Sequence, residues 1–295
     1  MKSMKGMFLL LAANILIMVT LSLTVPLLIN VILPMFGIDL RGSVDLSSMV
    51  WALVLGFGGA FISLAFSKQM ARAMLDCQQI TQPHSQAEHV IYGAVQEIAQ
   101  RLHITMPEVW VYDSPDPNAF ATGPSKNNSM VAVSTGLLQN LQEEEVKAVL
   151  AHEMGHVYNG DMFATTILAG LMNTFVYYIA MWVRRFFAER DQAALGFGLS
   201  LALQIIISII ASVLISWHSR HREYAADAFS ARVYGKQSMI AALQSIDRWV
   251  NRAQFEYSGQ DALATMKISG NSSGFMHLFA THPPIEARVA ALEQL

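Results

Sequence analysis

The sequence predicts an α+β membrane protein that is mainly helical, with four hydrophobic helices and a polar domain containing a small antiparallel sheet. Three observations lead to this fold class. The 295-residue chain is 53% hydrophobic and only 14% charged, with a mean hydropathy of +0.37, which is more apolar than ordinary soluble proteins. Several apolar stretches approach the roughly 20 residues that a helix needs to cross a bilayer. Polar segments between and after them carry helix and strand patterns.

The apolar stretches run over residues 7–32, 49–66, 163–183 and 193–217. The first follows Lys2 and Lys5, but it is too long for a secretory signal and lacks a small-residue cleavage site, so we expect a retained helix. In the second, Gly56, Gly58 and Gly59 indicate close helix packing. The predicted domains are two amino-terminal transmembrane helices (1–66), a first part of the polar domain (67–161), a transmembrane hairpin (162–217) and a second part of the polar domain (218–295).

The first polar segment contains two predicted helices and three predicted strands. Apolar residues recur at helical spacing over residues 87–102, and a second helix is expected over 142–159, with three glutamates in its first turn and Gly160 as its stop. Turn-forming residues separate three short runs of strand character, which predicts a small antiparallel sheet. These runs are Glu108–Tyr112, Ala119–Thr122 and Met130–Ser134.

Charges that flank the spans predict their orientation. The positive-inside rule places the amino terminus and both polar segments in the cytoplasm, because the basic residues at these span ends are Lys2, Lys5, Lys68, Arg72, Arg220 and Arg222. The loop between the third and fourth stretches disagrees, since it contains Arg184, Arg185 and Arg190. Either the positive-inside rule does not hold for this loop, or these two stretches form a hairpin that does not fully cross the bilayer. Both alternatives return the chain to the side of the membrane that it left.

The strongest chemical signal is the run His152-Glu153-Met154-Gly155-His156 in the second predicted helix. Imidazoles four residues apart lie on one helix face about one turn apart, near enough to bind one tetrahedral metal ion. Glu153 lies beside that face and can reach a water that the metal activates without being a ligand itself. The run therefore predicts a metal-activated hydrolase that uses one Zn²⁺ per chain, with Glu153 as the general base.

Two zinc histidines need a third protein ligand. In one class of enzymes it is a histidine six residues beyond the second one, with a glycine halfway; Met162 and Asn159 occupy those positions, which excludes that class. A glutamate on a later helix is the other option, and Glu223 fits. Asp227 follows one turn later, placed to accept a hydrogen bond from the outer nitrogen of a zinc histidine. The structural alternative is a solvated helix face on which Glu223 and Asp227 pair with neighbouring arginines.

Composition argues against several other classes of function. The net charge of −3 gives no reason to expect nucleic acid as a partner. Cys77, the single cysteine, cannot form an internal disulfide or supply a cysteine-rich structural zinc site. The charged run Glu143–Lys147 immediately precedes the histidine motif, whereas an intramembrane protease carries its motif inside an apolar span. We therefore expect a juxtamembrane site.

Taken together, these residues resemble the HtpX heat-shock membrane metalloproteases of the bacterial inner membrane, which are related to the CAAX prenyl endoproteases. The resemblance covers nearly the whole chain and also includes residues 118–123 and Thr281-His282-Pro283-Pro284 with Arg288. It implies a gluzincin-like protease domain whose active site faces the cytoplasm, with Glu153 as general base. The zinc ligands that it implies are His152, His156 and Glu223.

The resemblance also implies the partners: unfolded or damaged membrane proteins as substrates, degraded in quality control and stress response, and the lipid bilayer. The oligomeric state is not readable from the sequence. The alternatives are a CAAX-type prenyl-protein endopeptidase, whose families have more spans, and a non-catalytic zinc-stabilised membrane scaffold.

Two further roles are expected at the site. His282 either donates a hydrogen bond to the developing oxyanion, as the family likeness implies, or caps and orients the last helix; His218 and His221 are its rivals. An extended substrate is expected to pair with an edge strand, because backbone pairing aligns a chain without demanding a particular side chain. The residues of this candidate strand are Asn118, Ala119, Phe120 and Ala121.

Overall fold

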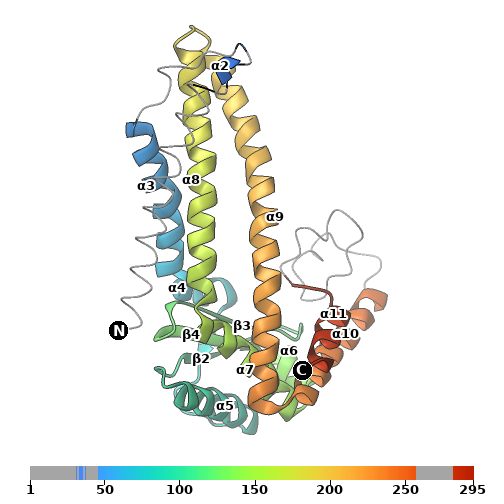
Figure 1. Cartoon of the computed structure of the whole chain (residues 1–295). Helices are drawn as coiled ribbons and strands as arrows, with labels where there is room; N and C mark the ends of the chain where they lie inside the picture. Colours follow the sequence, from blue (N-terminus) through green and yellow to red (C-terminus); the bar gives the residue numbers. More distant parts are fainter. Residues whose placement is uncertain (1–30, 32, 36, 38–45, 257–281) are drawn as a thin grey trace. The chain divides into compact units, whose positions relative to one another are not determined.

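A computed structural model of the chain describes residues 31, 33–35, 37, 46–256 and 282–295 (Figure 1). The helices are α2 Leu33–Met35, α3 Leu46–Ala65, α4 Ser67–Leu75, α5 Gln86–Leu102, α6 Thr135–Asn140, α7 Glu143–Asn159, α8 Asp161–Ala188, α9 Ala193–Tyr234, α10 Lys236–Glu256 and α11 Ile285–Glu293. The strands are β1 Gln78–Gln79, β2 Glu108–Tyr112, β3 Ala119–Ser125 and β4 Asn128–Ser134. The protein is mainly helical, as predicted.

The chain forms two compact units. Unit 1 comprises Met1–Gly59 and Ala169–Ile210, and unit 2 comprises Ala60–Leu168 and Ala211–Leu295. Within the described part of the chain, three helices are long and apolar enough to cross a membrane: Ser48–Ala65 in α3, α8 and α9. The first predicted apolar stretch, residues 7–32, lies outside the described residues apart from Val31.

In unit 1, α3 and α8 pack closely through glycine. A Cβ atom on Gly56 would collide with the backbone of Thr174, and one on Gly170 would collide with the ring of Phe57. The predicted packing role is therefore confirmed for Gly56. For Gly58 and Gly59 it stays a prediction: a Cβ atom at either position would meet no described residue within 4 Å, and residues 7–30 lie outside the described part of the chain.

Helix α9 is longer than the apolar stretch that predicted it. Its 42 residues extend about 63 Å, roughly twice the thickness of a bilayer core. No glycine or proline occurs between Leu199 and Tyr234, and Gly235, with φ of 90°, ends the helix. Glu223 and Asp227 consequently lie on the same helix as the fourth apolar stretch and not on a separate later one. Similarly, Arg184 and Arg185 belong to the end of α8, not to a loop.

Unit 2 contains a four-stranded sheet in the order β1-β2-β4-β3. The β3 and β4 strands form an antiparallel hairpin, and β1 is antiparallel to β2, but β2 and β4 are parallel, with Val109 opposite Val131. The prediction of a purely antiparallel sheet is therefore wrong. Strand β4 lies between β2 and β3 because it is the most apolar strand: Met130 and Val131 are fully buried, one on each face. Strand β3 is left at the edge.

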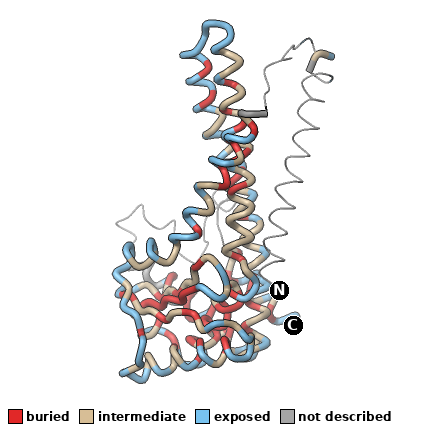
Figure 2. The backbone as a smooth tube through the Cα atoms, turned by 90° about the vertical axis from the view of Figure 1, so that its left-hand side faces the viewer, coloured by how far each residue is buried: buried red, intermediate tan, exposed pale blue. Residues whose placement is uncertain are grey.

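Helices cover both faces of this sheet. On one face, β4 residues join the main core, to which α5, α7, α10 and α11 contribute; its largest fully buried members include Ile91, Ile98, Leu150, Leu243 and Leu292. On the other face a smaller cluster forms around Tyr112, Met130 and Ala132, with Ala71 of α4 against it. Figure 2 shows the buried residues of unit 2 gathered inside it and the exposed ones around them.

The helix that carries the histidines begins and ends as predicted. Gln142 and Glu145 form a capping box, in which the Gln142 backbone N–H donates to the Glu145 carboxylate at 2.9 Å. At the other end Gly160 takes the left-handed conformation, with φ of 75°, and its N–H donates to the His156 carbonyl. Residues 161–188 then continue as α8, so a single turn residue separates the two helices.

Candidate metal centre

Close packing between α7 and α9 builds the site. Gly155 lies in the middle of the histidine motif, and a Cβ atom there would lie 3.3 Å from the Ala226 Cα atom and 3.2 Å from the ring of Phe229. The absence of a side chain at Gly155 therefore allows α9 to approach α7. The Ser230 hydroxyl donates to the Ala148 carbonyl at 2.7 Å, which fixes the register of the two helices. Glu223 consequently faces the histidines.

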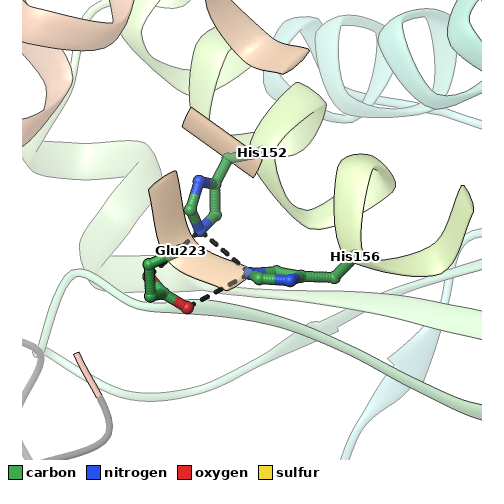
Figure 3. A group of neighbouring side chains, drawn as sticks. All are labelled: His152, His156 and Glu223. Carbon is green, nitrogen blue, oxygen red and sulfur yellow. Dashed lines mark hydrogen bonds and ion pairs between the residues drawn. The ribbon is translucent and has the colours of Figure 1, made fainter. Parts of the chain in front are cut away.

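Three side chains converge at this crossing (Figure 3). The Nε2 atoms of His152 and His156 are 3.2 Å apart. One carboxylate oxygen of Glu223 lies 3.2 Å from the His156 Nε2 atom, and the other lies 3.5 Å from the His152 Nε2 atom. Donor atoms held about 2.0–2.1 Å from one tetrahedral zinc ion are about 3.3 Å from each other, so this spacing suits a single ion.

The outer nitrogens of both imidazoles are engaged by carboxylates. The Asp227 Oδ1 atom lies 2.8 Å from His152 Nδ1, and the Asp161 Oδ2 atom lies 2.7 Å from His156 Nδ1. An ionised carboxylate only accepts, so each Nδ1 carries the proton and each Nε2 presents a lone pair. Two lone pairs and the Glu223 carboxylate thus point at one another, an arrangement that a divalent cation stabilises. The donor set fits zinc.

Arg288 of α11 ties the carboxylates together. Its side chain is 3% exposed, and it donates to both oxygens of Asp227, from Nε at 2.8 Å and from Nη2 at 2.6 Å. Its Nη1 atom lies 3.3 Å from the Glu223 carboxylate. Burial acts to lower the pKa of Arg288, but Asp227 more than offsets this and raises it, so the guanidinium stays charged.

Asp161 has a cation partner of its own. Arg222, one residue before Glu223 on α9, forms an ion pair with the Asp161 Oδ1 atom and also donates to the Asn159 carbonyl at 3.4 Å. Asp161 is thus held between His156 and Arg222. The residue that begins α8 thereby orients one of the two motif histidines.

Glu153 lies between two cavities of unit 2, both of which it lines together with His156. The first, of about 290 Å³, is bounded by Asn118, by residues 119–121 of β3 and by an apolar wall that includes Leu243. The second, of about 380 Å³, is lined in part by small polar side chains, among them Thr166 and Ser219. Burial raises the pKa of the Glu153 carboxyl, and the two imidazoles only partly offset the rise.

Comparison with known proteins agrees with this geometry. The sequence pattern of peptidase family M48 matches residues 85–295, which include every residue of the site. The chain belongs to peptidase family M48.

Relatives in the family are similar to the chain over its full length. Protease HtpX of Idiomarina loihiensis is 42% identical over 296 residues, covering 99% of both chains. Protease HtpX of Tolumonas auensis is 43% identical over 302 residues, covering 99% of this chain and all of the relative. The resemblance to HtpX proteases that the motifs indicated is confirmed.

A solved structure has a similar fold. The crystal structure of S. mikatae Ste24p matches 98% of this chain and 67% of its own chain, with a TM-score of 0.63 at 18% identity. At this identity the likeness concerns the arrangement of helices and sheet.

Of the three candidate histidines outside the motif, the structure places only His282 at a cavity beside Glu153. His282 lines the first cavity, and its Nδ1 atom lies 2.8 Å from a Glu223 oxygen. The capping alternative for His282 is wrong, because Pro284 is the N-cap of α11 and no side chain caps it. His221 is exposed, with its ring against the Trp217 carbonyl of its own helix, and neither His221 nor His218 lines the two cavities beside Glu153.

Sequence reasoning missed two residues that contact the candidate site. Asp161 lies five residues beyond His156, a spacing that no continuous helix places on one face; the left-handed turn at Gly160 brings it back. Arg288 was part of the recognised motif but had no assigned contact. The signal that points to it is chemical: two buried carboxylates, Glu223 and Asp227, need a buried cation.

Proposed function

We propose that the chain is a zinc-dependent metalloendopeptidase of the membrane, with His152, His156 and Glu223 as the metal ligands. The observation that carries the proposal is the convergence of two Nε2 lone pairs and one carboxylate, while Asp227 and Asp161 hold the outer nitrogens. Membership of a peptidase family supplies the reaction class.

Bound zinc supplies Lewis acidity, which polarises the scissile carbonyl and lowers the pKa of water toward neutrality. Glu153 accepts a proton from the attacking water and returns it to the leaving amine. Asp227 and Asp161 keep the imidazoles in the tautomer that presents Nε2. We assign His282 to the carbonyl oxygen of the substrate, since it lines the same cavity as Glu153.

The substrate is proposed to bind as an extended strand along β3. This strand is at the sheet edge, paired only with β4 among the described strands, so its outer backbone groups are available to another chain. The first cavity beside Glu153 is lined by Asn118, Ala119, Phe120 and Ala121. Backbone pairing of this kind favours broad specificity for unfolded segments.

We place the active site beside the membrane, on the cytoplasmic face of the bacterial inner membrane. Glu223 follows Trp217, the end of the apolar part of α9, by six residues, which corresponds to about 9 Å along the helix. The protease domain is then assembled from residues 67–161 and 218–295. This location suits hydrolysis of damaged or misfolded membrane proteins in quality control and stress response, which the likeness to HtpX proteases supports.

The alternative proposal is a CAAX-type prenyl-protein endopeptidase, since such enzymes are related to the HtpX proteases that this chain resembles. Identity of 40–43% with HtpX proteases over the full chain favours the first proposal. Cleavage of a farnesylated peptide together with failure to cleave an unmodified unfolded protein would reverse this preference.

The test uses detergent-solubilised protein, an unfolded model protein as substrate, and a Glu153→Gln variant. We expect wild type to cleave, to stop on chelation and to recover with zinc. The variant should bind one zinc per chain, measured by elemental analysis, and lose at least about 10²-fold in rate. A variant that binds zinc and cleaves at the wild-type rate would refute the mechanism. A protein that unfolds on chelation but never cleaves would instead be a zinc-stabilised scaffold.

A further inference from the structure

Helix α4 continues from a candidate membrane span almost without a break. The span Ser48–Ala65 ends one residue before Phe66, and α4 begins at Ser67. The Phe66 N–H donates to the Ile62 carbonyl at 3.0 Å, and the Met70 N–H donates to the Phe66 carbonyl at 2.9 Å. Figure 1 shows α4 at the foot of α3. The start of α4 is therefore held where the apolar span ends.

The polarity of α4 is the inverse of that of a helix on a water-soluble domain. Its charged residues Lys68 and Arg72 face the sheet, together with Ala71, which packs against the cluster around Tyr112. Its large apolar residues point outward, and Met74 is 79% exposed. A helix on a soluble domain buries its apolar side and exposes its charges. The outward face of α4 consists of Phe66, Gln69, Met70, Ala73 and Met74.

The two cations are engaged by the protein. Lys68 Nζ lies 2.6 Å from the Glu108 carboxylate and 2.8 Å from the Asn128 side-chain oxygen, and its side chain is only 11% exposed. Arg72 also pairs with Glu108, and its guanidinium lies 4.6 Å from the ring centre of Trp110. None of the five residues of the outward face carries a charge; the exposed carboxylate of Asp76 lies beyond them, at the C-cap of α4.

We infer that the outward face of α4 is an interfacial membrane anchor, with Phe66, Met70 and Met74 inserted at the boundary between lipid headgroups and acyl chains. The span that ends at Ala65 brings the bilayer to this helix, and an uncharged face of one aromatic and two thioether side chains suits an apolar environment. The inference concerns α4 alone and does not depend on the proposed catalysis.

The anchor has a consequence for the sheet. Glu108 is the first residue of β2, and Asn128 is the first residue of β4, so the cations of α4 hold two adjacent strands at the same end. The sheet that carries the edge strand β3 is thus tied by side-chain contacts to a helix at the membrane surface.

The test places a single cysteine at Met70 or Met74 in a Cys77→Ser background and labels it with bimane, an environment-sensitive fluorophore, in proteoliposomes. We expect emission at a shorter wavelength than from the same label at Gln100, an exposed residue of α5. Lipids brominated on the acyl chains should quench the Met70 label, and aqueous iodide should quench the Gln100 label. Ile62, 62% exposed on the span itself, provides the lipid-facing control.

Identical emission and iodide quenching at Met70 and Gln100 would overturn the inference, because the face would then lie in water. A shift that appears only when unfolded substrate is added, or that grows with the number of protein copies per vesicle, would overturn it too, since a polypeptide would be the occupant. A circular dichroism spectrum and a melting temperature like those of wild type confirm that each labelled protein keeps its fold.

Discussion

The two motif histidines are supported by the same chemistry in different surroundings. His152 is held by Asp227 and Arg288, whose side chains are each 3% exposed, whereas His156 is held by Asp161 and by Arg222, which is 30% exposed. The distances from the aspartate oxygens to the Nδ1 atoms of His152 and His156 are nearly equal, 2.8 and 2.7 Å. Water screens a charge pair near the surface more than one in the interior. We therefore expect the Asp227–Arg288 pair to matter more for stability than the Asp161–Arg222 pair, although the distances to the imidazoles are alike.

The largest expected effect is at Arg288. Arg288→Met leaves two buried carboxylates, those of Asp227 and Glu223, without their cation, and we expect a loss of roughly 3–5 kcal/mol in the free energy of unfolding. Thermal and urea unfolding in detergent measure it. Arg288→Lys is the matched control, since it keeps the charge and should recover part of the loss. If the Arg288→Met variant is as stable as wild type, the inner pair does not contribute more than the outer pair.

Replacing Asp227 and replacing Asp161 should lower the affinity for metal by different amounts. Loss of a partner that orients a metal-binding imidazole typically costs 10–100-fold in affinity. We expect Asp227→Asn to lose about 100-fold and Asp161→Asn about 10-fold, because Asp227 is deeper and also neutralises Arg288. Competition with a chromophoric chelator reports both values. Equal losses, or a larger one at Asp161, would mean that burial does not set the difference.

Arg222 should contribute less to stability than Arg288. Its guanidinium is 30% exposed, so Arg222→Met is expected to cost under about 1 kcal/mol in stability. The same unfolding measurement, with Arg288→Met run beside it, compares the two cations directly. A loss as large as that of Arg288→Met would show that the outer pair is as tightly coupled as the inner one.

The smallest effect on stability is expected at Glu108, a carboxylate near the surface. Burial acts to raise the pKa of Glu108, but the Lys68 and Trp110 hydrogen bonds and the charges of Lys68 and Arg72 lower it below the ordinary 4.5. Its stabilising contribution is therefore present above pH 4.5 and lost as pH falls through the lowered value. The melting temperature of wild type should exceed that of Glu108→Gln at pH 7, by an amount equivalent to about 1 kcal/mol or less, and the gap should close in acid. A gap that widens in acid would contradict this sign.

Much of this site could be predicted because helical periodicity links its residues. His152 and His156 are four apart on α7, and Glu223 and Asp227 are four apart on α9, so each pair had to share a face. The structure brings the two pairs together. Nothing in the local pattern links Arg288 to them, since contacts between elements distant in sequence depend on packing.

The sheet illustrates the same limit. Alternation and turn residues located the strands to within a few residues, and the helix over 87–102 is confirmed as α5. Strand order is not a local property. The parallel pairing of β2 with β4 arises because β4, apolar on both faces, occupies the middle of the sheet, which displaces β3 to the edge.

The continuity of α9 sets a constraint on insertions and deletions. Each residue added to or removed from an unbroken helix turns everything beyond it by about 100° and shifts it by about 1.5 Å. The six-residue interval from Trp217 to Glu223 therefore fixes the angular phase between the lipid-facing side of the helix and its carboxylates. An insertion or deletion in that interval would therefore turn Glu223 and Asp227 away from the histidines of α7.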